Sequence, residues 1–367
     1  MSVLGTDMAA HRMAMDEGRG EFRPLADLLG KDSPHAGLRA GWIEDRAALC
    51  NRMWSPASMA ATHVAREAVA DAGWSGDDVR GSALVLGTSR GNAAGWLAPW
   101  PGRRPFRTMA VSNTIHNEPA SAVSIRLGIQ GPSHVLASGC SAGLDALGVA
   151  MMLLATGKAE RALVVAVDLP LVPALLDSYA ASGLLSKRDR IDPYHAATDG
   201  FVPGEAAAAI AIEMTDGPGP RLVCHFGNCD AAHPLAIPAN GGRTPDLLKL
   251  ATDGHGAPAV VIPHATGTVA QARAEAAMFG RMFSSWKPDV CLLKPWIGHT
   301  LGASGLIETA ILAGFLRENR LPPAFPGLTP MPGMRFADAQ AGRFQGTICK
   351  LAHSLGGHNS LLYLQQP

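Results

Sequence analysis

An excess of charge of one sign is the first feature that this sequence lacks. Its 367 residues include 31 lysines and arginines and 31 aspartates and glutamates, so the whole chain has no field that would attract nucleic acid or an anionic membrane. A local basic patch can exist within such a balance, so this argument excludes little by itself. With no other sign of either partner, we expect neither nucleic acid nor a membrane to bind.

A long apolar run and an apolar leader are missing as well. The most apolar stretch, residues 162–176, is interrupted by Asp168, Pro170 and Pro173 and is too short to cross a bilayer. The first twenty residues carry several charged side chains and show no signal-peptide pattern. These observations predict a cytoplasmic protein.

Clustered cysteines are missing too. The six cysteines are Cys50, Cys140, Cys224, Cys229, Cys291 and Cys349. In a chain of this size, such scattered cysteines indicate reduced thiols rather than a disulfide scaffold. One of them is therefore a candidate for chemistry.

What the sequence does contain is an alternation of strand-like and helix-like segments. Short apolar runs predict strands over residues 83–86, 134–137, 162–167, 206–212, 221–225, 259–262, 290–293 and 361–364. Longer segments with a helical recurrence of apolar residues lie at 58–72, 141–156, 270–282 and 303–317. This interleaving is typical of a layered α/β protein, and the helix over 141–156 is apolar on nearly every face, which predicts that it is buried between layers.

The clearest break in composition is the turn-rich segment from Thr215 to Pro220. It divides the chain into two halves, 1–215 and 216–367. Each half runs strand, turn, long helix and strand, which permits a duplicated α/β unit. A chain that is 47% hydrophobic and 17% charged is long enough to form a core for both.

Cys140 lies at a bend between a predicted strand and the predicted buried helix, in the sequence Ser138-Gly-Cys-Ser-Ala-Gly143. Free amides and the positive end of the helix dipole would stabilise a thiolate there, so we expect the pKa of Cys140 to be lowered. Gly139 and Gly143 would permit the sharp turn. The alternative interpretation, a cysteine that acts as a small buried hydrophobic residue, is the commoner one for an isolated case.

Two histidines follow strand-like runs in the second half. His264 lies in His264-Ala-Thr-Gly-Thr268, and His299 lies in Lys294-Pro-Trp-Ile-Gly-His299. Strand-end loops are where the sites of α/β proteins assemble. A neutral imidazole can donate a hydrogen bond to a developing oxyanion or enolate, although most isolated loop histidines only satisfy nearby backbone groups.

Four motifs together resemble beta-ketoacyl synthases, because they fall in the order seen in that family. They are Gly139-Cys-Ser-Ala-Gly143, His264-Ala-Thr-Gly-Thr268, Lys294-x-x-x-Gly-His299 and Gly356-Gly-His-Asn359. The likeness extends to residues 117–133, 192–205 and 230–233, and so covers most of the chain from about Val85 onward, whereas the first eighty residues match only loosely. It implies a thiolase-like fold with duplicated βαβαβ halves in five layers, α/β/α/β/α, usually as a homodimer or heterodimer.

The resemblance also implies a reaction. Cys140 would accept an acyl chain from the phosphopantetheine thioester of an acyl carrier protein, and His264 and His299 would assist decarboxylation of a malonyl unit that then extends the chain by two carbons. No other cofactor and no metal are implied.

Supporting roles come from the same resemblance. Lys294 and Glu308 would form a buried polar support beside the histidines, although Glu308 on an exposed helix face is the simpler alternative. Glu275 would lie behind His264. The remaining implied contacts are the oxyanion hole formed by the backbone amides of Cys140 and Leu355, and the pantetheine contacts of Thr266 and Thr268.

Several positions depart from the family pattern. The acyl gate, usually aromatic, reads His353-Ser-Leu-Gly-Gly357, so both His353 and Leu355 differ. Ala272 replaces an acidic residue, and Ala265 replaces the glycine after the first active-site histidine. Because no catalytic group is lost, these changes favour a specialised fatty acid or polyketide synthase with an unusual acyl chain or partner.

Four further patterns have competing interpretations. A metal site drawn from Cys224, His225, Cys229 and His233 lacks zinc-knuckle spacing, and Gly87-Thr-Ser-Arg-Gly91 is only a weak phosphate loop. The arginines Arg103, Arg104 and Arg107 would either contact an acidic acyl carrier protein or face solvent. The tryptophans Trp96 and Trp100 would line an acyl tunnel, lie at a subunit contact or pack in the core.

Two alternative functions stay open on the sequence. One is an acyltransferase or esterase on the same fold that uses Cys140 without decarboxylation. The other is a chain-length-determining partner subunit of a ketosynthase heterodimer, which the presence of the cysteine disfavours. A thiolase is less favoured because no second cysteine lies in a glycine-rich turn near the C-terminus.

Overall fold

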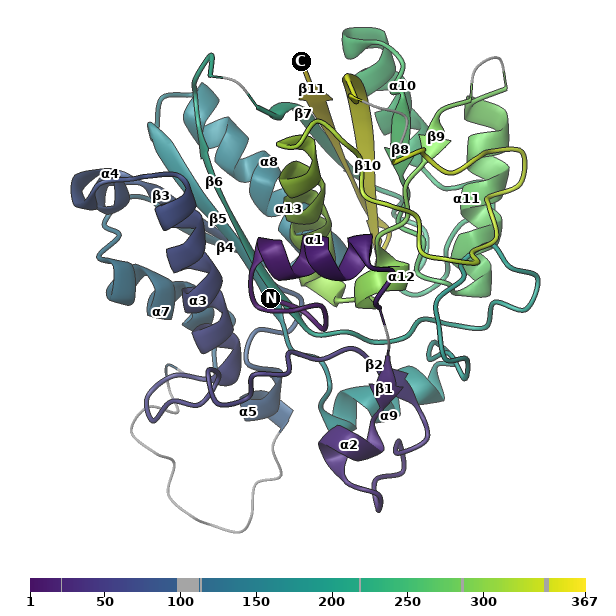
Figure 1. Cartoon of the computed structure of the whole chain (residues 1–367), viewed down its shortest axis with the longest axis horizontal. Helices are drawn as coiled ribbons and strands as arrows, with labels where there is room; N and C mark the ends of the chain where they lie inside the picture. The colour runs from purple at the N-terminus through teal and green to yellow at the C-terminus, as the bar shows by residue number, and fades with distance from the viewer. Residues whose placement is uncertain (21, 98–111, 113, 218, 285–286, 340–342) are drawn as a thin grey trace.

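Two β-sheets lie at the centre of the molecule, with two helices between them (Figure 1). The computed structural model describes the whole chain except residues 21, 98–111, 113, 218, 285–286 and 340–342. A short two-stranded sheet pairs β1 (Arg23–Pro24) with β2 (Arg39–Ala40). The helices and the two large sheets together give the thiolase-like α/β architecture that the sequence predicts.

The first large sheet is built entirely from the N-terminal part of the chain. In spatial order its strands are β4 (Ser133–Leu136), β3 (Ala83–Gly87), β5 (Arg161–Asp168) and β6 (Ala206–Glu213). The first three run parallel and β6 runs antiparallel to β5. β3 is buried along its whole length, which explains its uninterrupted apolar sequence.

The second large sheet is built from the C-terminal part. In spatial order its strands are β7 (Arg221–Cys229), β11 (His358–Gln366), β10 (Gly346–Ser354), β8 (Val260–Ile262) and β9 (Asp289–Val290). β10, β8 and β9 run parallel, whereas β11 is antiparallel to both of its neighbours. The division of the chain at residues 215 and 216 falls between β6 and β7 and stays a prediction.

The helices form three layers around these sheets (Figure 1). α8 (Ala142–Ala155) and α13 (Ser304–Leu316) lie between the sheets, α3 (Pro56–Asp71) and α7 (Glu118–Leu127) cover the first, and α10 (Thr244–His255) and α11 (Val269–Met282) cover the second. The shorter ones are α1 (Met8–Asp16), α2 (Ala26–Leu29), α4 (Gly76–Gly81), α5 (Ala93–Leu97), α9 (Pro173–Ala181), α12 (Lys294–Ile297), η1 (Gly139–Ser141) and η2 (Leu301–Ala303). None of the helices in the described part of the chain has the length and hydrophobicity that crossing a bilayer requires.

The two central helices approach each other closely because glycine occupies the contact on both. A β-carbon on Gly143 of α8 would lie 2.8 Å from the carbonyl oxygen of Gly302, and one on Gly305 of α13 would lie 2.8 Å from the amide nitrogen of Leu144. Neither distance is compatible with a real side chain. The absence of side chains at these two positions therefore sets the separation of α8 and α13.

We expect Gly305→Ala to destabilise the protein by about 1–3 kcal/mol, because the added methyl group overpacks the crossing of α8 and α13. Urea unfolding measures this difference. Gly280→Ala is the matched control, since Gly280 lies in α11 with open space around it and alanine favours a helix more than glycine does. Equal stability of the two variants would contradict the role of the glycine contact.

Candidate functional site

Cys140 lies where the chain turns from β4 into α8. Its neighbour Gly139 has φ +63°, a left-handed conformation that glycine adopts without steric cost, and the 3₁₀ turn η1 then leads into the helix. The Cys140 side chain is half-buried. The bend that the sequence predicts therefore places the thiol at the amino end of the central helix α8.

His264 follows β8 and its backbone is fixed by Glu275 of α11. The Glu275 carboxylate accepts hydrogen bonds from the His264 amide at 2.8 Å and from the Ala265 amide at 3.2 Å. Tyr194 donates a further hydrogen bond at 2.9 Å. Ala265 has φ +47°, a conformation that disfavours a side chain, so the buried carboxylate holds a strained turn behind the histidine.

His299 lies between α12 and η2 and connects the two halves. Its amide donates to the Val202 carbonyl at 2.8 Å, and its carbonyl accepts from the Gly204 amide at 3.0 Å, just before β6 begins. Its ring nitrogen Nδ1 lies 3.2 Å from the Ser304 hydroxyl. The imidazole is therefore held by backbone pairing and by a side-chain hydrogen bond.

The fold brings Cys140, His264 and His299 together from three separate segments. One donor atom of each, the thiol sulfur and a ring nitrogen of each histidine, lies within 4.8 Å of the others. The two imidazole rings meet edge to face, with centroids 5.3 Å apart. Of the described residues, this is the one group of three or more side chains of metal-binding type that is close enough to hold an ion.

The electrostatics of the three groups differ in part from expectation. Burial lowers the pKa values of His264 and His299 well below the ordinary range, and Lys294 adds to the effect, so both imidazoles are neutral at pH 7. Burial raises the pKa of Cys140 to about 12, with Asp168 acting in the same direction. The expectation of a lowered cysteine pKa is therefore wrong for the free protein, because desolvation outweighs the pull of Lys294.

Glu308 lies between two buried lysines rather than one. Its carboxylate oxygens accept from Lys294 at 2.6 Å and from Lys350 at 2.8 Å, and all three side chains are almost completely buried. Burial would raise the pKa of Glu308, but the two lysines hold it below its usual value, whereas burial lowers the pKa of Lys350 to about 8. The exposed alternative for Glu308 is thus wrong.

Lys350 itself was not expected from the motifs. The available signal was a lysine in the middle of the apolar strand sequence Ile348-Cys-Lys-Leu-Ala352. A charge in a buried strand needs a partner of opposite sign, and Glu308 is that partner.

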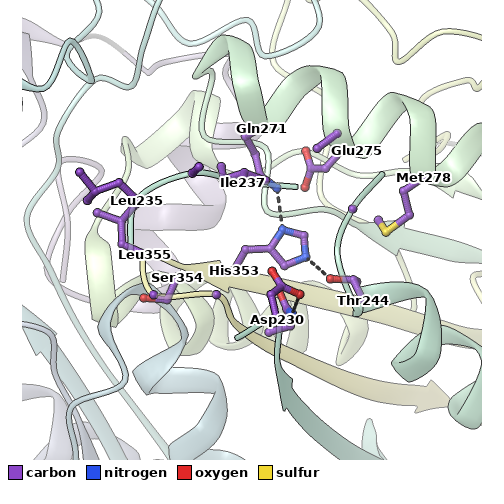
Figure 2. A pocket seen from close by; sticks show the side chains of 16 residues that line it. Asp230, Leu235, Ile237, Thr244, Gln271, Glu275, Met278, His353, Ser354 and Leu355 are labelled. Carbon is purple, nitrogen blue, oxygen red and sulfur yellow. Dashed lines mark hydrogen bonds between the residues drawn. The ribbon is translucent and has the colours of Figure 1, made fainter. Parts of the chain in front are cut away.

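His353, one of the two predicted gate residues, is held by hydrogen bonds on both sides of its ring (Figure 2). The His353 ring lies 2.6 Å from the Gln271 amide nitrogen on one side and 3.1 Å from the Thr244 hydroxyl on the other. The cavity behind it has a volume of only about 20 Å³, enough for a single water molecule. Leu355, the other gate position, lies on the turn after β10 with 40% of its surface exposed.

Ser354 was not expected to contribute to the site. Its hydroxyl oxygen accepts a hydrogen bond from the Cys140 amide at 3.0 Å. The amide that the family resemblance assigns to the oxyanion hole is therefore already engaged in the free protein. Nothing in the sequence pattern beyond the departure from the gate motif marks this contact.

The loop at Gly87–Gly91 points its amides at a carboxylate of the protein itself. Asp168, at the end of β5, accepts from the amides of Ser89 at 2.8 Å and Arg90 at 2.9 Å, and from the amide of Gly302 in η2 at 2.7 Å. This buried carboxylate joins the first sheet to the turn that follows His299. The weak phosphate-loop interpretation is replaced by an internal anion site.

The remaining predicted residues are placed as follows. The hydroxyls of Thr266 and Thr268 lie 3.2 Å apart at the start of α11. His225 of the metal alternative lies 2.9 Å from the Ser360 hydroxyl and 3.5 Å from the Asp145 carboxylate. Positions outside the described residues are Arg103, Arg104, Arg107, Trp100 and the side chain of Trp96.

Comparison with protein families gives two matches that together cover most of the chain. Residues 42–216 match the family model described as the N-terminal domain of beta-ketoacyl synthase. Residues 223–327 match the model described as the C-terminal domain of beta-ketoacyl synthase.

Three curated relatives are each 29% identical to this chain over the regions that align. It is 29% identical to highly reducing polyketide synthase sphB of Aspergillus fumigatus, over 76% of this chain and 11% of that protein. It is 29% identical to 3-oxoacyl-[acyl-carrier-protein] synthase 2 of Rhizobium meliloti, over 77% and 72% respectively. A third relative, actinorhodin polyketide putative beta-ketoacyl synthase 1 of Streptomyces coelicolor, is 29% identical over 62% of this chain and 51% of its own.

Solved structures share the fold at lower identity. A beta-ketoacyl synthase from Burkholderia phymatum superposes with a TM-score of 0.83 at 22% identity, covering 100% of this chain and 97% of that one. The ishigamide ketosynthase/chain length factor gives 0.84 at 19%, covering 100% and 96%. At these identities the likeness establishes the fold.

We expect Glu308→Gln to destabilise the protein by about 3–5 kcal/mol, because it leaves two buried lysines without a counter-charge. Adding Lys350→Met should recover part of the loss. Chemical denaturation measures both variants, with Asp253→Asn as the control because it breaks an exposed ion pair with Lys249. A Glu308→Gln variant no less stable than that control would contradict the buried charge arrangement.

The raised pKa of Cys140 predicts how its alkylation depends on pH. In the free protein the rate of reaction with iodoacetamide should rise about tenfold per pH unit from pH 7 to 9, because the thiolate fraction grows in that proportion below the pKa. Peptide mass spectrometry measures the rate at Cys140. The same cysteine in urea is the reference: its rate should reach half of its maximum near pH 8.5 and level off above pH 9.5, whereas such a curve in the folded protein would contradict the raised pKa.

Proposed function

Because the chain belongs to the beta-ketoacyl synthase family, we propose that it condenses an acyl chain with a malonyl unit during fatty acid or polyketide synthesis. The observation that supports this most directly is the convergence of Cys140, His264 and His299 within 4.8 Å beside a buried Lys–Glu–Lys group. That arrangement supplies a nucleophile and two neutral hydrogen-bond donors in one desolvated place.

The first half-reaction loads the acyl chain. The Cys140 sulfur attacks the carbonyl carbon of a carrier-bound thioester, the bond to the pantetheine sulfur breaks, and the thiol proton leaves with that sulfur. The neighbouring imidazoles are neutral, so a ring nitrogen can accept a hydrogen bond from the thiol as its proton is transferred to the departing sulfur. The product is an acyl thioester on Cys140 and a free carrier thiol.

The second half-reaction breaks one carbon–carbon bond and forms another. The malonyl carboxylate leaves as carbon dioxide, and its bonding electrons form an enolate that attacks the acyl carbonyl on Cys140. Cys140 leaves as a thiolate and takes up a proton. Neutral His264 and His299 donate hydrogen bonds to the enolate oxygen. Two imidazolium ions this close together, beside buried lysines, would repel each other.

One ring nitrogen of His264 is a candidate contact for the substrate. Nδ1 of His264 is buried without a hydrogen-bond partner among the described residues. Such a group is costly unless something bonds to it, and a substrate oxygen would serve. We assign the malonyl thioester to this position.

The acyl oxygen would be held by the amides of Cys140 and Leu355. In the free protein the Ser354 hydroxyl accepts from the Cys140 amide, so loading exchanges that hydroxyl for the thioester oxygen. The pantetheine arm would pass Thr266 and Thr268. The proposed partners are an acyl carrier protein and a second ketosynthase subunit, identical or different, and no further cofactor is needed.

Intact-protein mass spectrometry with a panel of acyl carrier thioesters tests the proposal. We expect an acyl adduct that Cys140→Ser abolishes and that disappears when malonyl carrier is added, with release of carbon dioxide. His264→Ala and His299→Ala should keep the adduct but lower carbon dioxide release about 10²- to 10³-fold, since each removes one donor to the enolate.

The alternatives give different outcomes in the same assay. An adduct that passes to another nucleophile without carbon dioxide would indicate an acyltransferase. No adduct unless a second subunit is added would indicate a chain-length-determining partner of a heterodimer.

A further inference from the structure

Cys140 packs against an apolar cluster that has no role in the reaction steps described above. The cluster is centred on α9, and Leu175 and Tyr179 are among its members. The other close neighbours of the thiol are His264 and His299, which the proposed reaction assigns to the malonyl unit. The cluster is therefore the surface left for an acyl chain on the Cys140 sulfur.

Tyr179 brings a polar group into this apolar cluster. The residue is only 5% exposed, and its ring packs edge to face on Phe201 with centroids 5.6 Å apart. Its hydroxyl is buried and has no partner with hydrogen-bond geometry among the described residues. A buried hydroxyl without a partner is costly, so phenylalanine would fill the same space at a lower cost. A ligand group that bonds to this hydroxyl would remove that cost.

Arg90 places a positive charge beside the same hydroxyl. Its amide donates to Asp168 at 2.9 Å, which fixes the loop after β3 against η2, where Leu301 belongs to the apolar cluster. Burial raises the pKa of Tyr179, the charge of Arg90 opposes that rise, and a Cys140 thiolate would add to it, so the three side chains share one neighbourhood. The Arg90 side chain is exposed and forms no ion pair in the part of the chain that the structure describes.

The nearest carboxylate, that of Asp168, is already occupied. It accepts from the amides of Ser89, Arg90 and Gly302 and from the hydroxyl of Thr88, at 2.7 to 2.9 Å. Its oxygens therefore serve the backbone of the loop and of η2. The guanidinium of Arg90 keeps its own donors for a ligand.

We propose, on the basis of the condensation proposed above, that Arg90 and Tyr179 select an acyl chain that carries a carboxylate. The group loaded on Cys140 would then be the half-thioester of a dicarboxylic acid. A guanidinium offers two parallel N–H donors that match a carboxylate, and the phenol offers one O–H donor. An unsubstituted aliphatic chain would instead leave the hydroxyl without a partner and remove water from the guanidinium.

The position of this pair favours the acyl chain over the phosphate of the carrier arm. The arm is assigned to Thr266 and Thr268, which precede α11, whereas Tyr179 lies on α9 in another part of the molecule (Figure 1). Arg90 follows β3 of the first sheet. A carboxylate at this pair and a phosphate on the arm would therefore approach Cys140 along different elements.

The rate of Cys140 loading from carrier thioesters tests the proposal. Succinyl, glutaryl and adipyl carriers are compared with butyryl, pentanoyl and hexanoyl carriers of equal carbon number, by intact-protein mass spectrometry. One or more of the dicarboxylic chains should load about 10- to 100-fold faster than its aliphatic counterpart, as charge-assisted hydrogen bonds would allow. Arg90→Met should slow only the dicarboxylic chain, and Tyr179→Phe should slow it less and load the aliphatic chain faster.

Arg66→Met is the matched control, because Arg66 is an exposed arginine on the outer helix α3, and it should change neither rate. Equal loading of each pair of chains by the parent protein would overturn the proposal. A uniform slowing of both kinds of chain by Arg90→Met would also overturn it and would assign Arg90 to contact with the carrier.

A second probe separates this proposal from the condensation. Sulfonatoethyl and propyl methanethiosulfonate differ in charge, and each forms a disulfide with the Cys140 thiolate as methanesulfinate leaves. Arg90→Met should lower the ratio of the sulfonatoethyl rate to the propyl rate about tenfold, whereas Arg66→Met should leave it unchanged. An unchanged ratio would refute the anion site even in a protein that condenses. A lowered ratio in a protein that loads no acyl chain would uphold the anion site and refute the condensation.

Discussion

The close crossing of α8 and α13 is the constraint on which the rest of the structure depends. Gly143 and Gly305 allow the two helix backbones to approach within contact distance, and each sheet then packs on the outside of this pair. Cys140 lies just before α8, and His299 lies just before α13 and η2. The contact between α8 and α13 therefore sets the distance between the Cys140 thiol and the His299 imidazole.

A second constraint is electrical. Glu308 neutralises one of its two buried lysines, so Lys294 and Lys350 together leave a positive excess beside the histidines. That excess and burial both oppose protonation of His264 and His299, which keeps them as neutral donors. In the proposed reaction the two neutral histidines would therefore stabilise the enolate by hydrogen bonds. The positive charge would stay on Lys294 and Lys350, behind the histidines.

Sequence patterns predicted the architecture well because apolar periodicity and glycine turns are local properties. The strand before Cys140, the buried helix α8 and the loops of both histidines all lie close to where their patterns place them. Contacts between distant segments carry no local pattern, which is why the Ser354 hydroxyl on the Cys140 amide was missed. The direction of the Cys140 pKa was wrong for a related reason: desolvation depends on the whole surroundings, whereas the helix end can be read from a few residues.

In the free protein the Ser354 hydroxyl occupies the Cys140 amide that the proposed substrate oxygen would need, so it would compete with that substrate. The hydroxyl is part of the chain at the end of β10, beside the Cys140 amide. Its effective concentration is therefore high and does not depend on the protein concentration. A free acyl compound would have to displace this hydroxyl from the Cys140 amide at its own low concentration. A thioester held by a bound pantetheine arm would have a high local concentration as well, and so would displace the hydroxyl more readily. In the proposed chemistry, the competition between the Ser354 hydroxyl and the thioester oxygen would favour carrier-bound over free acyl groups at the binding step, before any bond is broken.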